Sequence, residues 1–231
     1  EIKIKDLISL ARAVEGSPQL FVLDSITKEG ILSANINLKF DLNGEIKKNY
    51  QINGTINKAK FNIFNQVEID NLNLSFNISN NQLTLSKIET DLNSIKLKSP
   101  LIKIEEKKNI FFINGKVIND QQNFDINKLK PILGDLLNNI EIEKIDFNSV
   151  STFSFNVNKK LKLNDLKLET NLNLENFEIV KNPLNLKSFL PNYTEQVKFE
   201  DHKIKIKLTK NILNIKGDGD IYIGDELEQL S

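Results

Sequence analysis

Apolar and polar residues alternate one by one through most of this chain, and this pattern limits the fold more than any other feature of the sequence. In Ile36–Leu42 and Leu72–Ile78, hydrophobic residues occupy every second position, and polar or charged residues fill the positions between them. Successive side chains of a β-strand point to opposite faces of the sheet. The alternation therefore predicts strands that each carry one apolar face and one hydrated face.

Turn signals separate the alternating segments roughly every ten residues, which is the spacing typical of consecutive hairpins. Asn43-Gly44, Asn80-Asn81 and Asn114-Gly115 are examples. Asparagine and glycine tolerate the positive φ angles that tight hairpins need. We therefore expect an all-β, mainly antiparallel fold with a few short helices.

Three segments have helical spacing instead, at residues 6–15, 125–139 and 183–190. They predict a helical lead-in over 1–30, a first strand-rich block over 31–120, a helical insert over 121–140 and a second strand-rich block over 141–231. No linker rich in proline, glycine or serine separates the two blocks, so we expect one continuous structure.

The charge balance and the absent residue types exclude several classes of protein. Lysine plus arginine and aspartate plus glutamate each total 31, so the net charge is zero and no basic field for nucleic acid is expected. The chain has no cysteine, which excludes disulfides and thiolate zinc sites. No apolar run reaches the ~20 residues of a membrane-spanning helix, and no signal peptide is visible. The chain begins without methionine, and we expect a fragment of a longer protein, with any membrane anchor outside it.

A search for catalytic or metal-binding residues finds no pattern that predicts such a site. His202, the only histidine, lies between two alternating segments, and we expect a solvated turn residue there. The acidic cluster of Asp218, Asp220, Asp225 and Glu226 does not have the spacing of a calcium loop. We expect no enzymatic activity, no metal and no cofactor.

The apolar strand faces are the remaining candidate for a function. The alternation alone favours a closed β-sandwich core over a groove for acyl chains, but it does not separate the two. In either case we expect one shared concave or interior surface. The residues predicted to form it are Ile36, Leu38, Phe40, Leu72, Leu74, Phe76, Phe153, Phe155, Leu172 and Leu174.

Tyr50–Phe61 begins a strand rhythm that resembles a known family. The rhythm continues through Val67–Phe76, Leu83–Leu85, Ile95–Leu97 and Ile113–Val117, and Leu213–Ile223 resembles a closing strand pair. This stretch, residues 30–225, resembles the AsmA-like envelope proteins of bacteria, especially the central region of the YhdP type. The likeness is one of rhythm, with no invariant signature.

The resemblance implies a long twisted sheet that curls into an apolar trough and binds or conducts phospholipid between the inner and outer membranes. Such proteins are similar to bridge-like lipid carriers and take part in outer membrane biogenesis. It implies a periplasmic location, tethered to the inner membrane through an anchor outside this fragment, and phospholipid acyl chains as partners. No catalytic residues carry over. The alternative left open by the residues themselves is a non-enzymatic structural or adhesive β-sandwich module.

Overall fold

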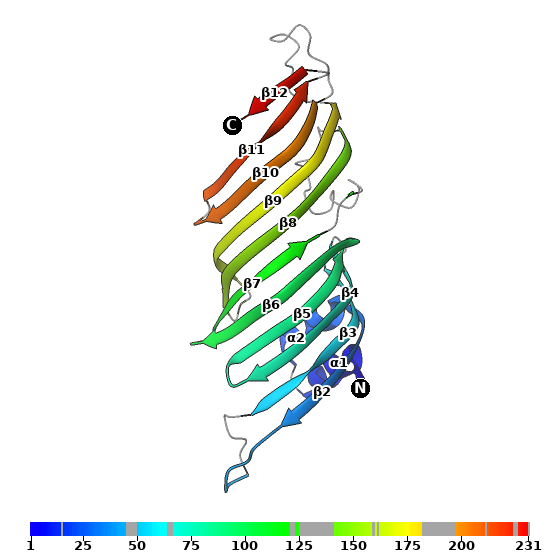
Figure 1. Cartoon of the computed structure of the whole chain (residues 1–231). Coiled ribbons are helices and arrows are strands. Elements are labelled where there is room, and N and C mark those ends of the chain that lie inside the picture. The colour runs from blue at the N-terminus through cyan, green and yellow to red at the C-terminus, as the bar shows by residue number, and fades with distance from the viewer. Residues whose placement is uncertain are drawn as a thin grey trace. The chain divides into compact units, whose positions relative to one another are not determined.

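The chain forms an antiparallel β-sheet with two short helices near its N-terminus (Figure 1). The computed structural model describes residues 1–14, 16–44, 50–63, 67–120, 123–124, 141–158, 160, 162–181, 197–210, 212–223 and 226–230. Within these ranges, twelve strands follow one another in the sheet in chain order. The predicted all-β, antiparallel fold is therefore confirmed. The elements are β1 (Ile2–Lys3), α1 (Ile4–Val14), α2 (Pro18–Ile26), β2 (Thr27–Asn37), β3 (Gln51–Ile63), β4 (Val67–Ser79), β5 (Gln82–Leu92), β6 (Ile95–Lys107), β7 (Ile110–Asn119), β8 (Glu141–Asn158), β9 (Leu163–Lys181), β10 (Val197–Thr209), β11 (Ile212–Ile223) and β12 (Glu226–Leu230).

The strands belong to two compact units. Unit 1 comprises Glu1–Val117 and Phe153–Leu166, and it contains β1 to β6, most of β7 and the tip of the β8–β9 hairpin. Unit 2 comprises Ile118–Thr152 and Lys167–Ser231, and it contains most of β8 and β9 and all of β10 to β12.

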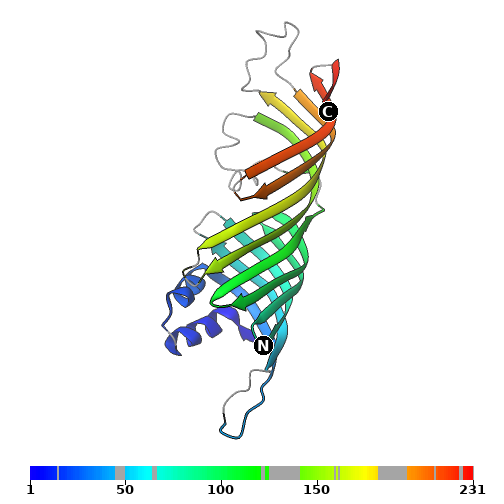
Figure 2. The same ribbon diagram turned by 90° about the vertical axis from the view of Figure 1, so that its left-hand side faces the viewer.

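Both helices belong to unit 1 and lie on one side of its sheet (Figure 2). The predicted first helix is confirmed as α1, which buries Ile4 and Ile8 against Ala59 of β3. The predicted helices over 125–139 and 183–190 lie outside the described residues.

Helix α2 was not predicted from the sequence. Ser17 is its N-cap and accepts a hydrogen bond from the Leu20 backbone N–H at 3.4 Å, and Pro18 takes the first helical position. Serine at the N-cap followed by proline is a helix-start signal, because the cap satisfies an otherwise unpaired N–H and proline has none to lose.

A line of β-bulges crosses β2 to β5 and explains a shift in the sequence pattern. Lys58, Asn71 and Lys87 each have a φ near +50°, and the strand registers shift beside them. Each bulge adds one residue, so the apolar residues change between odd and even positions of the sequence at that point. Because of this shift, their side chains still point to the same side of the sheet. The side chains of Phe61 and Leu72, on opposite sides of this line, both pack against the cluster formed by Ile4, Ile8 and Ala59.

Unit 2 is held together by the long pairings of β9, β10 and β11. Val197 and Ile221 are buried, and Phe199 packs against both. The ring centroids of Phe177 and Phe199 lie 5.5 Å apart. A bulge at Asp201, with φ of 51°, shifts β10 against β11. As in unit 1, the bulge keeps the apolar residues of its strand on one face.

Candidate apolar binding face

In unit 1, cross-strand rows of hydrophobic residues build one continuous apolar face. Residues paired across antiparallel strands point to the same side of the sheet, so the register assigns each row to a face. Leu32, which packs beside α1, identifies the helix side. The rows on that side, called here the apolar face, are Ile36–Ile52–Ile78–Leu83–Ile104, Ala34–Gly54–Phe76–Leu85–Ile102 and Leu32–Ile56–Leu74.

Aromatic rings cover two glycines on this side of unit 1. Gly54 pairs with Phe76 across β3 and β4, and a Cβ on Gly54 would lie 2.9 Å from Cζ of Phe76. A Cβ on Gly115 would lie 2.8 Å from Cζ of Phe153. The rings thus lie over the space that a glycine side chain leaves open, and they keep the face apolar where it has no side chain of its own.

Most of the apolar face is half-buried rather than enclosed. Phe76, Leu85 and Ile102 are all in this intermediate class, and Ile36 is 63% exposed. The helices pack over β2 to β4. Leu74 and Ile88, in contrast, are 8% and 7% exposed. The face therefore has a packed region near the bulges and an open region toward the hairpin turns.

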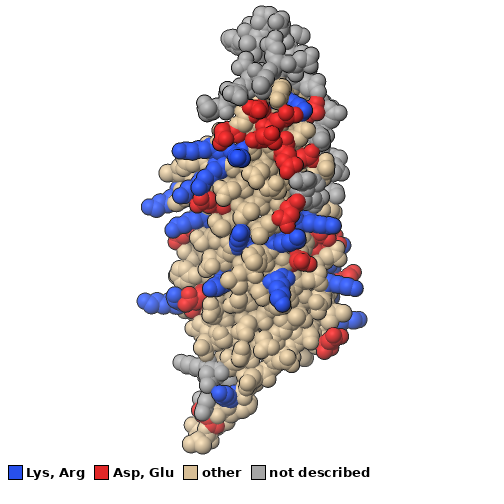
Figure 3. Space-filling model, viewed as in Figure 1, with Lys and Arg blue, Asp and Glu red and all other residues tan. Residues whose placement is uncertain are grey.

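Three rows on the opposite face of β2 to β5 are polar and uncharged, and β6 continues two of them with Lys103 and Glu105. Figure 3 views this side, where residues without charge cover much of the area over β2 to β4. Short neutral side chains occupy this face, and each is next in sequence to a residue of the apolar rows. They are Ser33–Thr55–Ser75–Ser86, Asn35–Asn53–Asn77–Thr84 and Asn37–Gln51–Ser79–Gln82.

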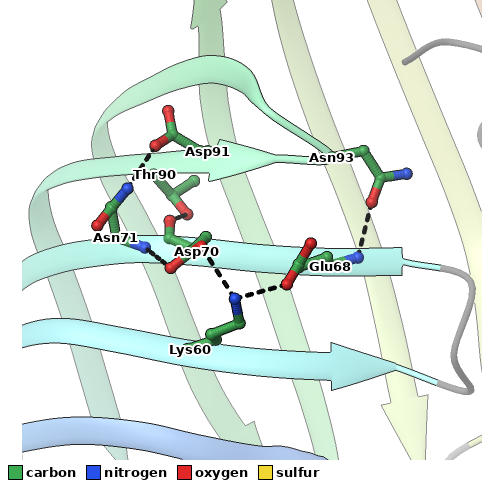
Figure 4. A network of polar contacts seen from close by, with 7 residues as sticks. All are labelled: Lys60, Glu68, Asp70, Asn71, Thr90, Asp91 and Asn93. Carbon is green, nitrogen blue, oxygen red and sulfur yellow. Dashed lines mark hydrogen bonds and ion pairs between the residues drawn. The ribbon is translucent and has the colours of Figure 1, made fainter. Parts of the chain in front are cut away.

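On the other side of the line of bulges, charged residues of the polar face form a network on β3 to β5 (Figure 4). The Lys60 Nζ lies 2.6 Å from Glu68 Oε1 and 3.1 Å from Asp70 Oδ2, and the Asn71 side-chain amide donates to Asp91 at 2.7 Å. The Lys60 hydrogen bond holds the pKa of Asp70 below its usual range, and the Glu68 and Asp70 carboxylates raise the pKa of Lys60. Unit 1 therefore has one hydrated side and one apolar side.

The structure brings together some of the predicted surface residues and separates others. Ile36, Leu72, Leu74 and Phe76 share the apolar face of unit 1. Phe153 and Phe155 belong to the same unit, and their rings stack with centroids 5.9 Å apart.

Leu38 and Phe40 lie beyond the end of β2 and are 38% and 57% exposed. Leu172 and Leu174 belong to unit 2, where Leu172 pairs with Ile204 and Leu174 with His202. The remaining members of the apolar face were missed, although they carry the same alternation. They are Leu32, Ala34, Ile52, Gly54, Ile56, Ile78, Leu83, Leu85, Ile102 and Ile104.

The expectation for His202 is wrong, because this residue is buried within β10 and is only 8% exposed. Its Nδ1 lies 2.9 Å from the Glu200 carbonyl oxygen, and its ring meets the edge of Phe199. The ring covers Gly219, where a Cβ would overlap it. The bulge at Asp201 turns the histidine onto the apolar side of unit 2, so the hairpin-like sequence does not form a turn.

Neither a metal site nor a membrane-spanning helix is found among the described residues. No group of three or more histidine, cysteine, aspartate or glutamate side chains in these ranges is placed to hold a metal ion. No helix in the same ranges has the length and hydrophobicity needed to cross a bilayer. Comparison with known proteins returned no matching family model, no matching curated protein and no matching solved structure.

Proposed function

We propose that the apolar face of unit 1 binds the acyl chains of phospholipids. The observation that carries this proposal is the open part of that face, where Phe76, Leu85 and Ile102 are half-exposed on a sheet whose other side is mainly polar. Large contiguous apolar surfaces on a folded protein mark sites that bind an apolar partner.

The chemistry of the face favours a long, flexible, apolar ligand. The central row offers methyl, methylene and aromatic groups and no side-chain hydrogen-bonding group, so a polar ligand would gain nothing there. Each methylene of an acyl chain removed from water contributes about 0.8 kcal/mol. Because no polar group anchors the ligand at one position, a bound chain can slide from row to row.

The resemblance to the AsmA-like envelope proteins suggests the wider role of such a face. In that setting the chain is a periplasmic segment that passes phospholipid between the inner and outer membranes, with its inner-membrane anchor outside this sequence. A curled trough, formed as the sheet wraps around its ligand, is the shape that this role favours. The transfer needs no catalytic residue, since a lipid moves along the face without breaking a bond.

A structural or adhesive β-module is the second candidate. Leu74, Ile88 and Ile95 are 8%, 7% and 6% exposed, which is the burial of a packed core rather than of a ligand surface. In this case the apolar face contributes stability only, and the purified protein carries no lipid.

A pair of neighbouring substitutions separates the two candidates. Phe76→Asp places a carboxylate on the apolar face, whereas Ser75→Asp places the same group on the polar face of the same strand. We expect Phe76→Asp to lose co-purified phospholipid, measured by mass spectrometry, while its melting temperature stays close to that of Ser75→Asp.

Unfolding of Phe76→Asp alone would instead indicate a closed core, because a buried carboxylate without a partner costs several kcal/mol. Lipid that remains bound to Phe76→Asp, or that is absent from the unchanged protein, would contradict the proposal.

A further inference from the structure

A hollow of about 760 Å³, called here the lysine hollow, lies on the polar side of β9, β10 and β11 in unit 2. Its middle row is Leu172–Ile204–Gly217, and a polar row flanks that row on either side. The two polar rows are Asn173–Lys203–Asp218 and Asn171–Lys205–Lys216, and Ile215 completes the lining. Because neighbours along a strand point to opposite sides of the sheet, both polar rows project away from the side of Ile204. Hollows of roughly 300–1,000 Å³ are typical of small-molecule sites.

Lysine dominates the charge of this hollow, since three of the four charged side chains in its lining are lysines and the fourth is Asp218. Lys205 is partly neutralised by Glu169, whose Oε1 lies 2.8 Å from the Lys205 Nζ, and this contact holds the pKa of Glu169 below its usual range. Lys203 and Lys216 form no ion pair with any residue that the structure describes. The lysine hollow therefore carries positive charge that the neighbouring side chains do not neutralise.

Two of the lysines stand directly opposite each other, Lys205 on β10 and Lys216 on β11. Directly opposite residues have Cβ atoms about 4.5–5.5 Å apart, and like charges at such positions destabilise the pairing of the strands. An anion between the two ammonium groups would replace this repulsion by attraction. The opposed pair therefore favours an anionic ligand over a neutral or cationic one.

A hollow of the same build in unit 1 carries no charge. It measures about 470 Å³ and lies over the row that contains Gly54, between two polar rows of hydroxyl and amide side chains. These rows are Ser33–Thr55–Ser75–Ser86 and Asn35–Asn53–Asn77–Thr84. A hollow between two polar rows of this sheet thus forms without lysine, so the fold of unit 2 does not require the lysines that line its own hollow.

We propose that the lysine hollow binds the phosphate group of a ligand. Lysine binds phosphate as a point charge, and the phosphate oxygens accept several hydrogen bonds at once. Asn171 and Asn173 add amide donors beside the lysines. The Asn173 amide donates to Asn148 Oδ1 at 3.0 Å, which orients the group and leaves its second N–H for a ligand. A soluble phosphate and a phospholipid headgroup share this chemistry, and the inference does not depend on lipid binding by unit 1.

The test is an NMR titration of the ¹⁵N-labelled chain with two probes, at about 0.15 M salt so that charges beyond about 8 Å are screened. One probe is inorganic phosphate, and the other is glycerophosphoglycerol, the deacylated headgroup of phosphatidylglycerol. We expect saturable shifts of the Lys205, Lys216 and Gly217 amides. Tighter binding of inorganic phosphate would assign the hollow to a soluble phosphate, and tighter binding of glycerophosphoglycerol would assign it to a lipid headgroup.

Three substitutions locate the binding. Lys216→Gln should weaken it about threefold to fivefold, whereas Asp218→Asn should strengthen it by removing the carboxylate of the lining. Lys207→Gln is the matched control, because Lys207 lies on the same face of β10 outside the hollow, and it should change the Kd less than about twofold. The proposal is overturned if neither probe gives saturable shifts, if the shifts lie outside the hollow, or if Lys207→Gln weakens binding as much as Lys216→Gln.

Discussion

Replacing Gly54 by alanine tests whether β2, β3 and β4 approach one another as closely as the structure shows. A Cβ at this position would overlap the Ser33 carbonyl oxygen and lie 2.8 Å from the Cα of Ala34. Both are backbone atoms of β2 and cannot rotate away. Gly217 in β11 is the matched control, since its nearest neighbour, Cγ1 of Ile204, would lie 3.3 Å away.

The two substitutions should have different effects on the free energy of unfolding. Alanine recovers the roughly 0.5–1 kcal/mol that glycine costs in a strand interior. At Gly54 the overpacking penalty of about 1–3 kcal/mol applies near its upper end, so we expect a net loss of about 2 kcal/mol. At Gly217 the flexible Ile204 side chain can give way, so the change should stay within about 0.5 kcal/mol.

Urea unfolding followed by far-UV circular dichroism measures both changes. A loss of about 2 kcal/mol lowers the urea midpoint by roughly 1 M for a typical dependence on denaturant. Amide exchange in β3 then locates the loss in unit 1. If Gly54→Ala unfolds at the same urea concentration as Gly217→Ala, the close approach of β2 to β3 is wrong.

Three further predictions concern single side chains of unit 1. The Lys60 hydrogen bond lowers the pKa of Asp70, so the stabilisation from this pair is present above the unfolded pKa near 3.8 and is lost as the pH falls through the folded pKa. The melting temperature of Lys60→Met should therefore fall less between pH 7 and pH 2.5 than that of the unchanged protein. An equal fall in both proteins would contradict the network. Lys87 has a φ of 51°, so Lys87→Val should lower the free energy of unfolding in urea by about 1–2 kcal/mol, whereas Lys87→Gly should lower it little or raise it. Equal losses for the two variants would argue against the bulge. Ser17→Ala should destabilise the start of α2 by about 1 kcal/mol, seen as faster exchange of the Leu20 amide, and unchanged exchange would argue against the cap.

The strands and their apolar sides could be predicted because alternation is a local property of the chain. The bulges can also be recognised in the sequence, because each one interrupts the alternation of its strand. In β4 the apolar positions change from Ile69 to Leu72, with Asp70 and Asn71 side by side between them. Two consecutive polar residues within an alternating strand leave one extra residue, and asparagine accepts the positive φ that a bulge needs.

Other features depend on neighbours that the local pattern does not reveal. Leu38 and Phe40 continue the alternation of β2, but the described pairing of β2 with β3 ends at Asn37, opposite Gln51. His202 is buried because β10 continues through its bulge, although an Asp-His-Lys sequence is typical of a turn.

Photo-crosslinking at two adjacent positions of β5 tests the lipid-binding face most directly. Leu85 pairs with Phe76 and Ile102 on the apolar face, while Thr84 pairs with Asn77 on the polar face. A benzophenone amino acid is introduced at one position or the other, and the protein is irradiated with phospholipid vesicles. Acyl-chain binding predicts a lipid adduct at position 85, detected by mass spectrometry, and little or none at position 84. Equal labelling of both positions, or an adduct at position 84 alone, would contradict a lipid-binding apolar face.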